Sequence, residues 1–369
     1  MITLIIPPSP FLLDERVFPS LGLLKIAAVL QSKYELNVLD LSGIKNYLDV
    51  MDSYLKQKDS NIFCITATTP QLPHSIKIKD LIKKHKPNSR VVLGGPHVTL
   101  VYAAYKNNPN KRSTMNKNVL EEHFDCLVSG DGEKAIFPAI ETTQRFIDGD
   151  DPKQQYFLTN EDYEVLPYPA RELIDLESYH YTIDGKKATS IIAQLGCPFN
   201  CGFCGGRLSN SLRRIRTRSG HNILHEIEFL HKEYGLEGFM FYDDELNVNK
   251  QFESLLTDLI KLQQKLGVDP IGKFGPKTEA AVKAWQKANG LKDDGIVGDA
   301  TWAKLFGESK PTTEVIKEDV VIPSGGPLNI EKLKGHIPDS VISQIPETAK
   351  KFNITNNLRL AHFLAQCGH

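Results

Sequence analysis

The chain has 369 residues, a length that allows two or three domains. Its composition, 41% hydrophobic and 24% charged, is ordinary for a soluble globular protein. The formal net charge of −1 gives no global argument for nucleic acid or an acidic membrane as a partner. No apolar run approaches the ~20 residues of a membrane span. The apolar N-terminus lacks a basic region and contains a double proline, which argues against a signal peptide. We therefore expect a cytoplasmic protein with no membrane span.

The first 140 residues alternate between apolar β-rich runs and amphipathic helices. Helices are expected at 22–34 and 74–86, where apolar residues recur at helical spacing. Strands are expected at 2–7, 35–41, 62–69, 90–96 and 124–130. This alternation predicts a Rossmann-like, doubly wound parallel α/β sheet. Ligands bind such sheets beyond the carboxyl ends of the strands, where the turns GGPH (94–97) and GDGE (130–133) lie.

A second β/α region is expected after a polar segment at 142–155 and a proline-marked stretch at 166–181. It begins with a strand at 188–196 and continues with a helix at 221–235 and a strand at 238–245. Between the first strand and the helix lies a basic cluster. A solvated loop is the favoured interpretation of this cluster and an anion site is the alternative. Its members are Arg207, Arg213, Arg214, Arg216 and Arg218.

Three of the six cysteines form a C-x₃-C-x₂-C motif directly after a predicted strand: Cys197, Cys201 and Cys204. A disulfide framework would spread its cysteines more evenly, so the clustering indicates a metal or an iron-sulfur cluster in a reducing compartment. A four-iron cubane held by three thiolates keeps one iron open for a substrate. Zinc is the alternative, but it usually takes a fourth protein ligand, and neither His180 nor His221 belongs to a second cysteine knuckle. A third possibility is that the cysteines are inert core residues.

After Gly267 a pattern G-x-Φ-G-x-x-T, in which Φ is apolar, occurs twice, at 272–278 and 295–301. Each copy opens a helix that carries a tryptophan, Trp285 or Trp302, and core packing is the favoured interpretation of both. A linker is expected at 308–327, followed by a helical tail. In the tail, Cys367 and His369 are interpreted as packing residues.

The stretch GCPFNCGFCGGR around the three cysteines resembles the cluster loop of the radical SAM family. In that family, S-adenosylmethionine (SAM) chelates the open iron of a 4Fe-4S cluster and is cleaved to a 5′-deoxyadenosyl radical. The resemblance implies that the three cysteines hold the cluster. It also implies SAM contacts from Phe203, Gly205, Asp243 and Asp244. Helix capping is an equally good interpretation of the two aspartates.

The residues before this loop resemble the cobalamin-binding domain of one radical SAM branch, on the segments PSLGLLKIAAVL, GGPHVT and VSGDGE. The D-x-H-x-x-G motif that ligates cobalt in some relatives is absent. Structural or loop roles are therefore favoured for the lone histidines His74 and His97. The resemblance implies cobalamin contacts from the two glycine turns, at Gly94, Gly95, His97, Gly130, Gly132 and Glu133.

Residues 259–306 resemble a three-helix peptidoglycan-binding module of bacterial and phage cell-wall hydrolases. Residues 327–369 resemble the start of a chitinase- or lysozyme-like domain, in which a catalytic glutamate follows the position of His369. The predicted organisation is a cobalamin-binding-like domain (1–141), a connector (142–187), a partial radical SAM domain (188–258), a peptidoglycan-binding domain (259–307), a linker (308–327) and a helical hydrolase-like segment (328–369).

Two functions of different classes stay open. The chain is either a radical-SAM-type protein with an appended wall-binding part, or an endolysin-type wall-binding protein whose N-terminal half is inactive. A (β/α)₈ barrel typically needs ~250 residues, and the residues from Ala188 to Gly267 allow two β/α units, which argues against catalysis. Peptidoglycan lies outside the membrane, so we expect contact with it only after membrane permeabilisation. A phage lysin or an artificial gene join would each explain the fusion.

Overall fold

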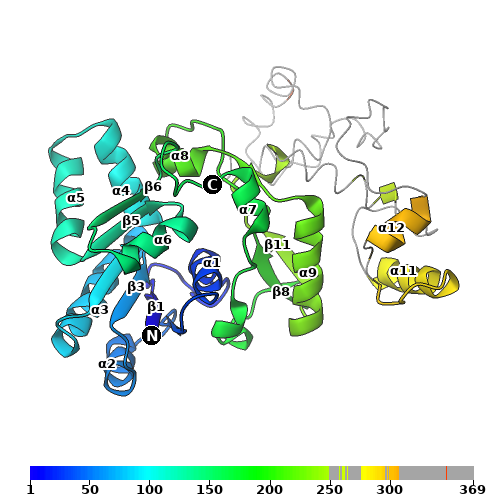
Figure 1. The fold of residues 1–369 in the computed structure, drawn as a ribbon, viewed down its shortest axis with the longest axis horizontal. Coiled ribbons are helices and arrows are strands. Elements are labelled where there is room, and N and C mark those ends of the chain that lie inside the picture. Colours follow the sequence, from blue (N-terminus) through cyan, green and yellow to red (C-terminus); the bar gives the residue numbers. More distant parts are fainter. Residues whose placement is uncertain are drawn as a thin grey trace. The chain divides into compact units, whose positions relative to one another are not determined.

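The computed structural model describes residues 1–248, 276–295, 297 and 299–306, with a few isolated positions elsewhere (Figure 1). Contacts divide the chain into two units, Met1–Thr301 and Trp302–His369. The predicted linker, the hydrolase-like tail with Cys367 and His369, and the glycines of the first G-x-Φ-G-x-x-T copy lie outside the described residues.

Six parallel strands form one sheet in the order β2-β1-β3-β4-β5-β6 (Figure 1). Because the chain runs outward from β1 to β2 and then returns to β3, the strand order reverses between β1 and β3. This is the topology of a doubly wound sheet. The strands are β1 (Ile2–Ile6), β2 (Leu36–Asp40), β3 (Ile62–Thr66), β4 (Arg90–Gly94), β5 (Cys126–Gly130) and β6 (Phe146–Gly149).

Two apolar clusters cover the two faces of this sheet. Successive strand residues alternate between them, with Leu4 and Ile6 in one cluster and Ile5 in the other. One cluster includes α1 and α6, and the other includes α2, α3, α4 and α5. The predicted fold class is therefore confirmed. The helices are α1 (Leu21–Leu30), α2 (Tyr47–Gln57), α3 (Leu72–His85), α4 (Pro96–Asn107), α5 (Lys111–His123) and α6 (Gly132–Glu141).

Strand β6 was not expected, because its residues lie in the segment interpreted as a polar connector. Ile147 is buried in one of the apolar clusters. The polar residues of the segment are bonded within the fold: Ser129 Oγ donates to Asp148 Oδ1 at 2.9 Å. A four-residue strand at the edge of a sheet needs little hydrophobic content, so the sequence carried almost no strand signal here.

The second β/α region contains a three-stranded sheet in the order β11-β8-β7. Strands β8 and β11 are parallel and are joined through α9, so this part forms one β/α/β unit. Its core is a small cluster that includes Ile191, Ile223 and Leu230. The elements are α7 (Asn160–Val165), β7 (Thr182–Ile183), β8 (Lys186–Ile191), β9 (Gln194–Leu195), α8 (Asn210–Arg213), β10 (Arg216–Thr217), α9 (Gly220–Tyr234) and β11 (Gly238–Phe241).

Farther along the described part of the chain lie the helices α11 (Pro276–Ala288) and α12 (Asp299–Phe306). Short 3₁₀ turns lie at Thr69–Gln71, Arg171–Leu173, Leu176–Ser178, Gly205–Leu208 and Leu246–Val248. Among the described helices, none combines the length and the apolarity needed to cross a bilayer.

Candidate functional site

The three cysteines of the motif lie in a loop whose two ends are held together by a short antiparallel pair. Strand β9 pairs with β10, with Leu195 opposite Arg216 and Gln194 opposite Thr217. Gly196 opens the loop with φ of +79°, and a Cβ atom there would lie 2.2 Å from the carbonyl oxygen of Arg214. Glycine is therefore required at this position, where the two ends of the loop approach each other.

All three thiols of this loop, which we call the cysteine loop (residues 196–215), are free. Cys197 is half-buried, whereas Cys201 and Cys204 are exposed. The Cys204 N–H donates to the Cys201 carbonyl oxygen at 3.1 Å, which brings these two residues into one turn. Phe203, between them, is 94% exposed. The loop thus presents thiols and an aromatic ring at the protein surface.

This donor set fits a cluster better than a single metal ion. Among the described residues, no three His, Cys, Asp or Glu side chains are grouped to bind one ion. In a four-iron cubane, each cysteine binds a different iron, so the three thiolates do not share one coordination sphere. The donor set of the cysteine loop therefore fits the iron-sulfur cluster that the spacing of the three cysteines predicts.

The middle of the cysteine loop lies beside helix α4. A Cβ atom added at Gly205 would lie 3.6 Å from Leu100 Cδ1, so the backbone of Gly205 runs close to the side chains of α4. Asn107 Nδ2, also on α4, donates to the Leu208 carbonyl oxygen at 3.0 Å. Helix α4 begins directly after the GGPH glycines, so the loop lies on the helix that follows β4.

The two predicted aspartates lie just beyond the carboxyl end of β11 and differ in their surroundings. Asp243 is half-buried, and its Oδ1 accepts the N–H of Ala193 at 3.0 Å and of Gln194 at 2.6 Å. Burial raises the pKa of Asp243 to about 6, although these two N–H groups oppose the shift. Asp244 is exposed. The aspartate contacts therefore tie the end of β11 to the segment that enters the cysteine loop.

The first predicted cobalamin turn lies at the carboxyl ends of β3 and β4. Gly94 ends β4, and Gly95 has φ of +94°. A Cβ atom on Gly95 would lie 2.6 Å from Thr66 Oγ1, so glycine is required where the two strand ends approach. The half-buried ring of His97 is hydrogen bonded through Nδ1 to Thr69 Oγ1 at 3.0 Å, and burial lowers its pKa. This edge carries polar groups close to glycine backbone.

At the second predicted turn, GDGE, other parts of the protein pack closely against the two glycines. A Cβ atom on Gly130 would lie 2.3 Å from the backbone nitrogen of Asp150, and one on Gly132 would lie 2.8 Å from Ile26 Cδ1. Burial raises the pKa of the Glu133 carboxyl. Backbone sterics within the protein account for Gly130, whereas Gly132 lies against the end of the Ile26 side chain, and the cobalamin contacts of this turn stay predictions.

Sequence reasoning missed a buried group of charges. Glu226 binds Arg171 at 2.9 Å and Arg218 at 2.5 Å, and each of the three side chains is at most 3% exposed. Burial by itself would raise the pKa of Glu226, but the two guanidinium groups hold it below its usual value. Glu226 lies on α9 three residues after buried Ile223 and four before buried Leu230, so helical periodicity already placed it on the buried face.

The interpretation of the basic cluster as a solvated loop was wrong for two of its members. Arg216 and Arg218 are 2% and 3% exposed. Both guanidinium groups form ion pairs with buried carboxylates, Asp131 and Glu226 respectively. From the sequence alone, a run of arginines is interpreted as solvent-exposed. The carboxylates that pair with Arg216 and Arg218 are distant in the sequence, so no local pattern indicates them.

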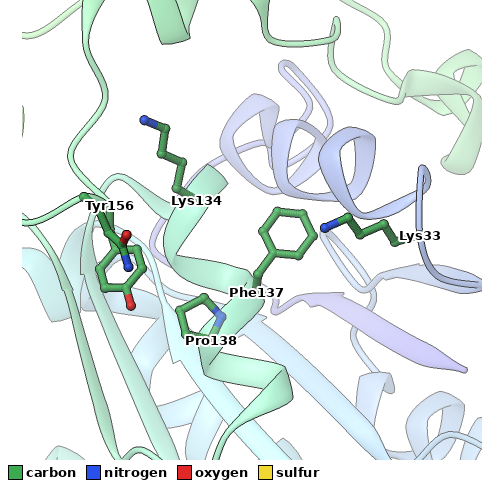
Figure 2. Close-up of a pocket in the computed structure, with 6 residues that line it drawn as sticks. Lys33, Lys134, Phe137, Pro138 and Tyr156 are labelled. Atoms are coloured by element: carbon green, nitrogen blue, oxygen red, sulfur yellow. The ribbon is translucent and has the colours of Figure 1, made fainter.

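A surface depression of about 420 Å³ lies beside α6 (Figure 2). Lys33 points toward the Phe137 ring, with Nζ 4.6 Å from the ring centroid (Figure 2). Lys134, which also lines the depression, is paired with Asp162. None of the residues predicted to bind a cofactor lines it. The other lining residues are Pro138, Gln155 and Tyr156.

The helices of the predicted wall-binding module bury the threonines of the repeated turn. Thr278 and Thr301 are 3% and 5% exposed. Gln286, 1% exposed, donates to Thr301 Oγ1 at 3.1 Å and accepts the Gly295 N–H at 2.8 Å. Trp285 and Trp302 are both half-buried. The repeat therefore serves the packing of its own helices.

Residues 249–305 match a family model described as a putative peptidoglycan binding domain. An uncharacterized methyltransferase of Pyrococcus horikoshii is 28% identical over 68% of this chain and 54% of that protein. The anaerobic magnesium-protoporphyrin IX monomethyl ester cyclase of Synechocystis is 26% identical over 66% of this chain and 49% of that protein. The chain thus spans about half the length of these curated relatives.

A solved structure extends the similarity to the fold. The radical S-adenosylmethionine methyltransferase TsrM from Kitasatospora setae superposes with a TM-score of 0.50 at 16% identity, over 77% of this chain and 57% of that one. TsrM has been solved with cobalamin and a [4Fe-4S] cluster bound. The comparisons confirm the resemblance predicted from the sequence: a region similar to radical SAM methyltransferases precedes a peptidoglycan-binding module in one chain.

Proposed function

We propose that residues 1–248 bind a 4Fe-4S cluster, SAM and cobalamin as a radical-SAM-type protein, and that residues 249–305 bind peptidoglycan. The observation that carries the first part is the cysteine loop, in which three free thiols share one partly exposed loop beside the parallel strands β8 and β11. When bound there, the cluster would offer SAM an iron that has no protein ligand.

The residues around the cysteine loop have distinct roles in this proposal. Cys197, Cys201 and Cys204 would hold the cluster. The exposed ring of Phe203 would cover SAM when it is bound. Asp243 already accepts two backbone N–H groups, so the exposed Asp244 is the better placed of the two carboxylates to contact SAM. Asp243 instead fixes the strand end from which the loop departs.

The proposed cobalamin site is the carboxyl edge of the large sheet. Doubly wound sheets bind ligands at this edge, near the point where the strand order reverses. His97 fits this role, because its half-buried ring supplies a polar group beside Thr69, whereas Gly95 lets the end of β4 pack against Thr66. The solved TsrM complex that contains cobalamin and a [4Fe-4S] cluster supports cobalamin as the ligand.

Anaerobic reconstitution with iron and sulfide tests the first part. We expect the parent chain to retain about four irons, because the cluster is a four-iron cubane. A variant with Cys197, Cys201 and Cys204 all replaced by alanine should retain none. The matched control replaces the two thiols buried in the large sheet, Cys64 and Cys126, and should retain the parent's iron. Equal iron in the parent and the triple variant would overturn the proposal.

Sedimentation with purified cell walls tests the second part. The parent chain should sediment with the walls, and a chain ending at residue 248 should stay in solution, because the matched module lies beyond that residue. Bovine serum albumin serves as the control for trapping. Sedimentation of both chains to the same extent would show that the module does not direct the binding.

A further inference from the structure

Within the cysteine loop, the segment around the first two cysteines packs against the short helix α8, which follows the third cysteine. The Cys197 N–H donates to the Leu212 carbonyl oxygen at 2.9 Å. Arg213 donates from Nη1 to the Phe199 carbonyl oxygen and from Nη2 to the Pro198 carbonyl oxygen, both at 2.9 Å. The path of the loop between the first two cysteines is therefore set by the position of α8.

A buried carboxylate of the large sheet holds the start of α8. Asp150, directly after β6, is 2% exposed. Its Oδ1 accepts the Ser209 hydroxyl at 2.6 Å, the Ser211 hydroxyl at 2.7 Å and the Ser211 N–H at 2.8 Å. Both serines are also buried. Three hydrogen bonds converge on one side-chain oxygen in a buried place, which fixes the position of that oxygen relative to both serines.

A second carboxylate, on the neighbouring strand, holds the same helix through an arginine. Asp131, directly after β5, accepts Arg216 Nη1 at 2.5 Å. Arg216 Nη2 in turn donates to the Ser211 carbonyl oxygen at 2.7 Å. Both carboxylates are thus bonded to Ser211, one directly and one through Arg216.

The two attachment points are fixed relative to each other by the sheet. Gly130 and Gly149 are partners in the β5–β6 register. A Cβ atom on Gly149 would lie 2.3 Å from the Asp131 carbonyl oxygen, as a Cβ atom on Gly130 would from the Asp150 nitrogen. No side chain fits between the two turns, so the backbone segments that carry Asp131 and Asp150 pack directly against each other.

We propose that Asp150 and Asp131 are positioning residues that set the geometry of the cysteine loop from the N-terminal sheet. This inference rests on the proposed function, because it assumes that the cysteine loop holds a cluster. It assigns the N-terminal domain a second task besides the binding of cobalamin. The cluster-binding loop is then shaped by a domain that contributes none of its thiols.

The test compares Asp150→Ala with Asp150→Asn in the full chain after reconstitution with iron and sulfide. The alanine removes the acceptor, whereas asparagine keeps one oxygen where Oδ1 lies. Removing a residue that orients a ligand typically weakens metal binding by about tenfold or more. We therefore expect Asp150→Ala to lose iron to a chelator about tenfold faster than the parent and to show an altered electron paramagnetic resonance spectrum of the reduced cluster. Asp150→Asn should resemble the parent.

Asp131→Ala should change the spectrum in the same direction as Asp150→Ala. Asp125→Ala is the matched control, because Asp125 pairs with Lys83 just before β5, at the other end of that strand. Circular dichroism of the apo variants checks folding. If Asp150→Ala does not fold, Ser211→Ala replaces it, since it removes a single hydroxyl contact to Asp150, and a smaller change in the same direction is expected.

The outcomes separate the two claims. If the parent takes up no cluster, the proposed function fails. If the parent takes up a cluster, and folded Asp150→Ala or Ser211→Ala matches its iron retention and its spectrum, the positioning role is overturned and the proposed function stands. A parent-like Asp131→Ala beside an altered Asp150→Ala would overturn the role of Asp131 alone.

Discussion

In the six-stranded sheet, both faces are covered by apolar clusters, and β1, β3, β4 and β5 place nearly all their side chains in the protein interior. The three-stranded sheet has one small apolar cluster. Around it lie buried ion pairs, and three buried side-chain oxygens in or beside β8 make no hydrogen bond within the described part of the chain. These are Thr189 Oγ1, Ser190 Oγ and Gln194 Oε1.

This contrast indicates that the two regions gain stability from different sources. The large sheet has its own hydrophobic core, which is the dominant stabilising contribution in a folded domain. The smaller region depends on charged and polar contacts, several of which reach residues of the large sheet or of the connector after it, such as Asp131, Asp150 and Arg171. Its folding should therefore depend on the large sheet, while the reverse dependence should be weak.

The largest effect is expected from a substitution that breaks the buried ion pairs of Glu226. Glu226→Gln leaves Arg171 and Arg218 without their carboxylate, and breaking a buried pair typically costs about 3–5 kcal/mol. Amide hydrogen exchange should show faster exchange in α9 and β8 and parent-like exchange in β1 and β3. The control is Glu237→Gln, which breaks an exposed pair with Lys186 and should cost under ~1 kcal/mol. Equal loss of protection in both sheets would contradict the independence of the large sheet.

A cavity in the large sheet tests whether the stability of the smaller region depends on the large sheet. Leu4 on β1 is fully buried, and Leu4→Ala typically costs about 2–5 kcal/mol for such a site. Because the smaller region uses the large sheet as a base, hydrogen exchange should become faster in both regions. Leu13→Ala is the control, since this leucine is fully exposed. Faster exchange confined to the large sheet would contradict the dependence of the smaller region.

The carboxyl of Asp243 makes the stability of the smaller region depend on pH. Its pKa is raised from 3.8 to about 6 in the folded protein, so the protonated carboxyl stabilises the folded state. This contribution to the free energy of unfolding is complete below pH ~4 and is lost as pH rises through 6. The loss is on the order of 3 kcal/mol. Asp243→Asn should flatten the fall in unfolding free energy between pH 4 and 6. A slope unchanged from the parent in urea unfolding would show that Asp243 is not the group responsible.

The smallest expected effect concerns the C-terminal module. Gln286→Leu removes the buried amide that bonds Thr301 and the Gly295 N–H, and unsatisfied buried groups cost about 1–3 kcal/mol. The variant should sediment less well with cell walls at elevated temperature, while iron uptake stays at the parent level. The exposed Lys287→Gln is the control. A matching loss of iron uptake would show that the module and the cysteine loop are not independent.

Local patterns in the sequence determined much of the fold. The apolar runs predicted the first five strands of the large sheet, β1 to β5, within a few residues, and the helical periods predicted α1, α3 and α9. The spacing of Cys197, Cys201 and Cys204 placed three thiols in one loop, because residues so close in sequence cannot separate far in space. The repeated glycine turns identified the wall-binding module that the family comparison confirms.

Only the tertiary structure decided which charges are buried and what they bind. Arg216 and Asp131 are 85 positions apart, and Ser211 and Asp150 are 61 positions apart. Arginine and aspartate stand in polar stretches that look solvated, since hydrophobic periodicity reports which side of an element faces a core but not which partner reaches it. Burial of an ionised side chain is stable only when a partner of opposite charge or several donors meet it, and the chain supplies those partners from distant strands.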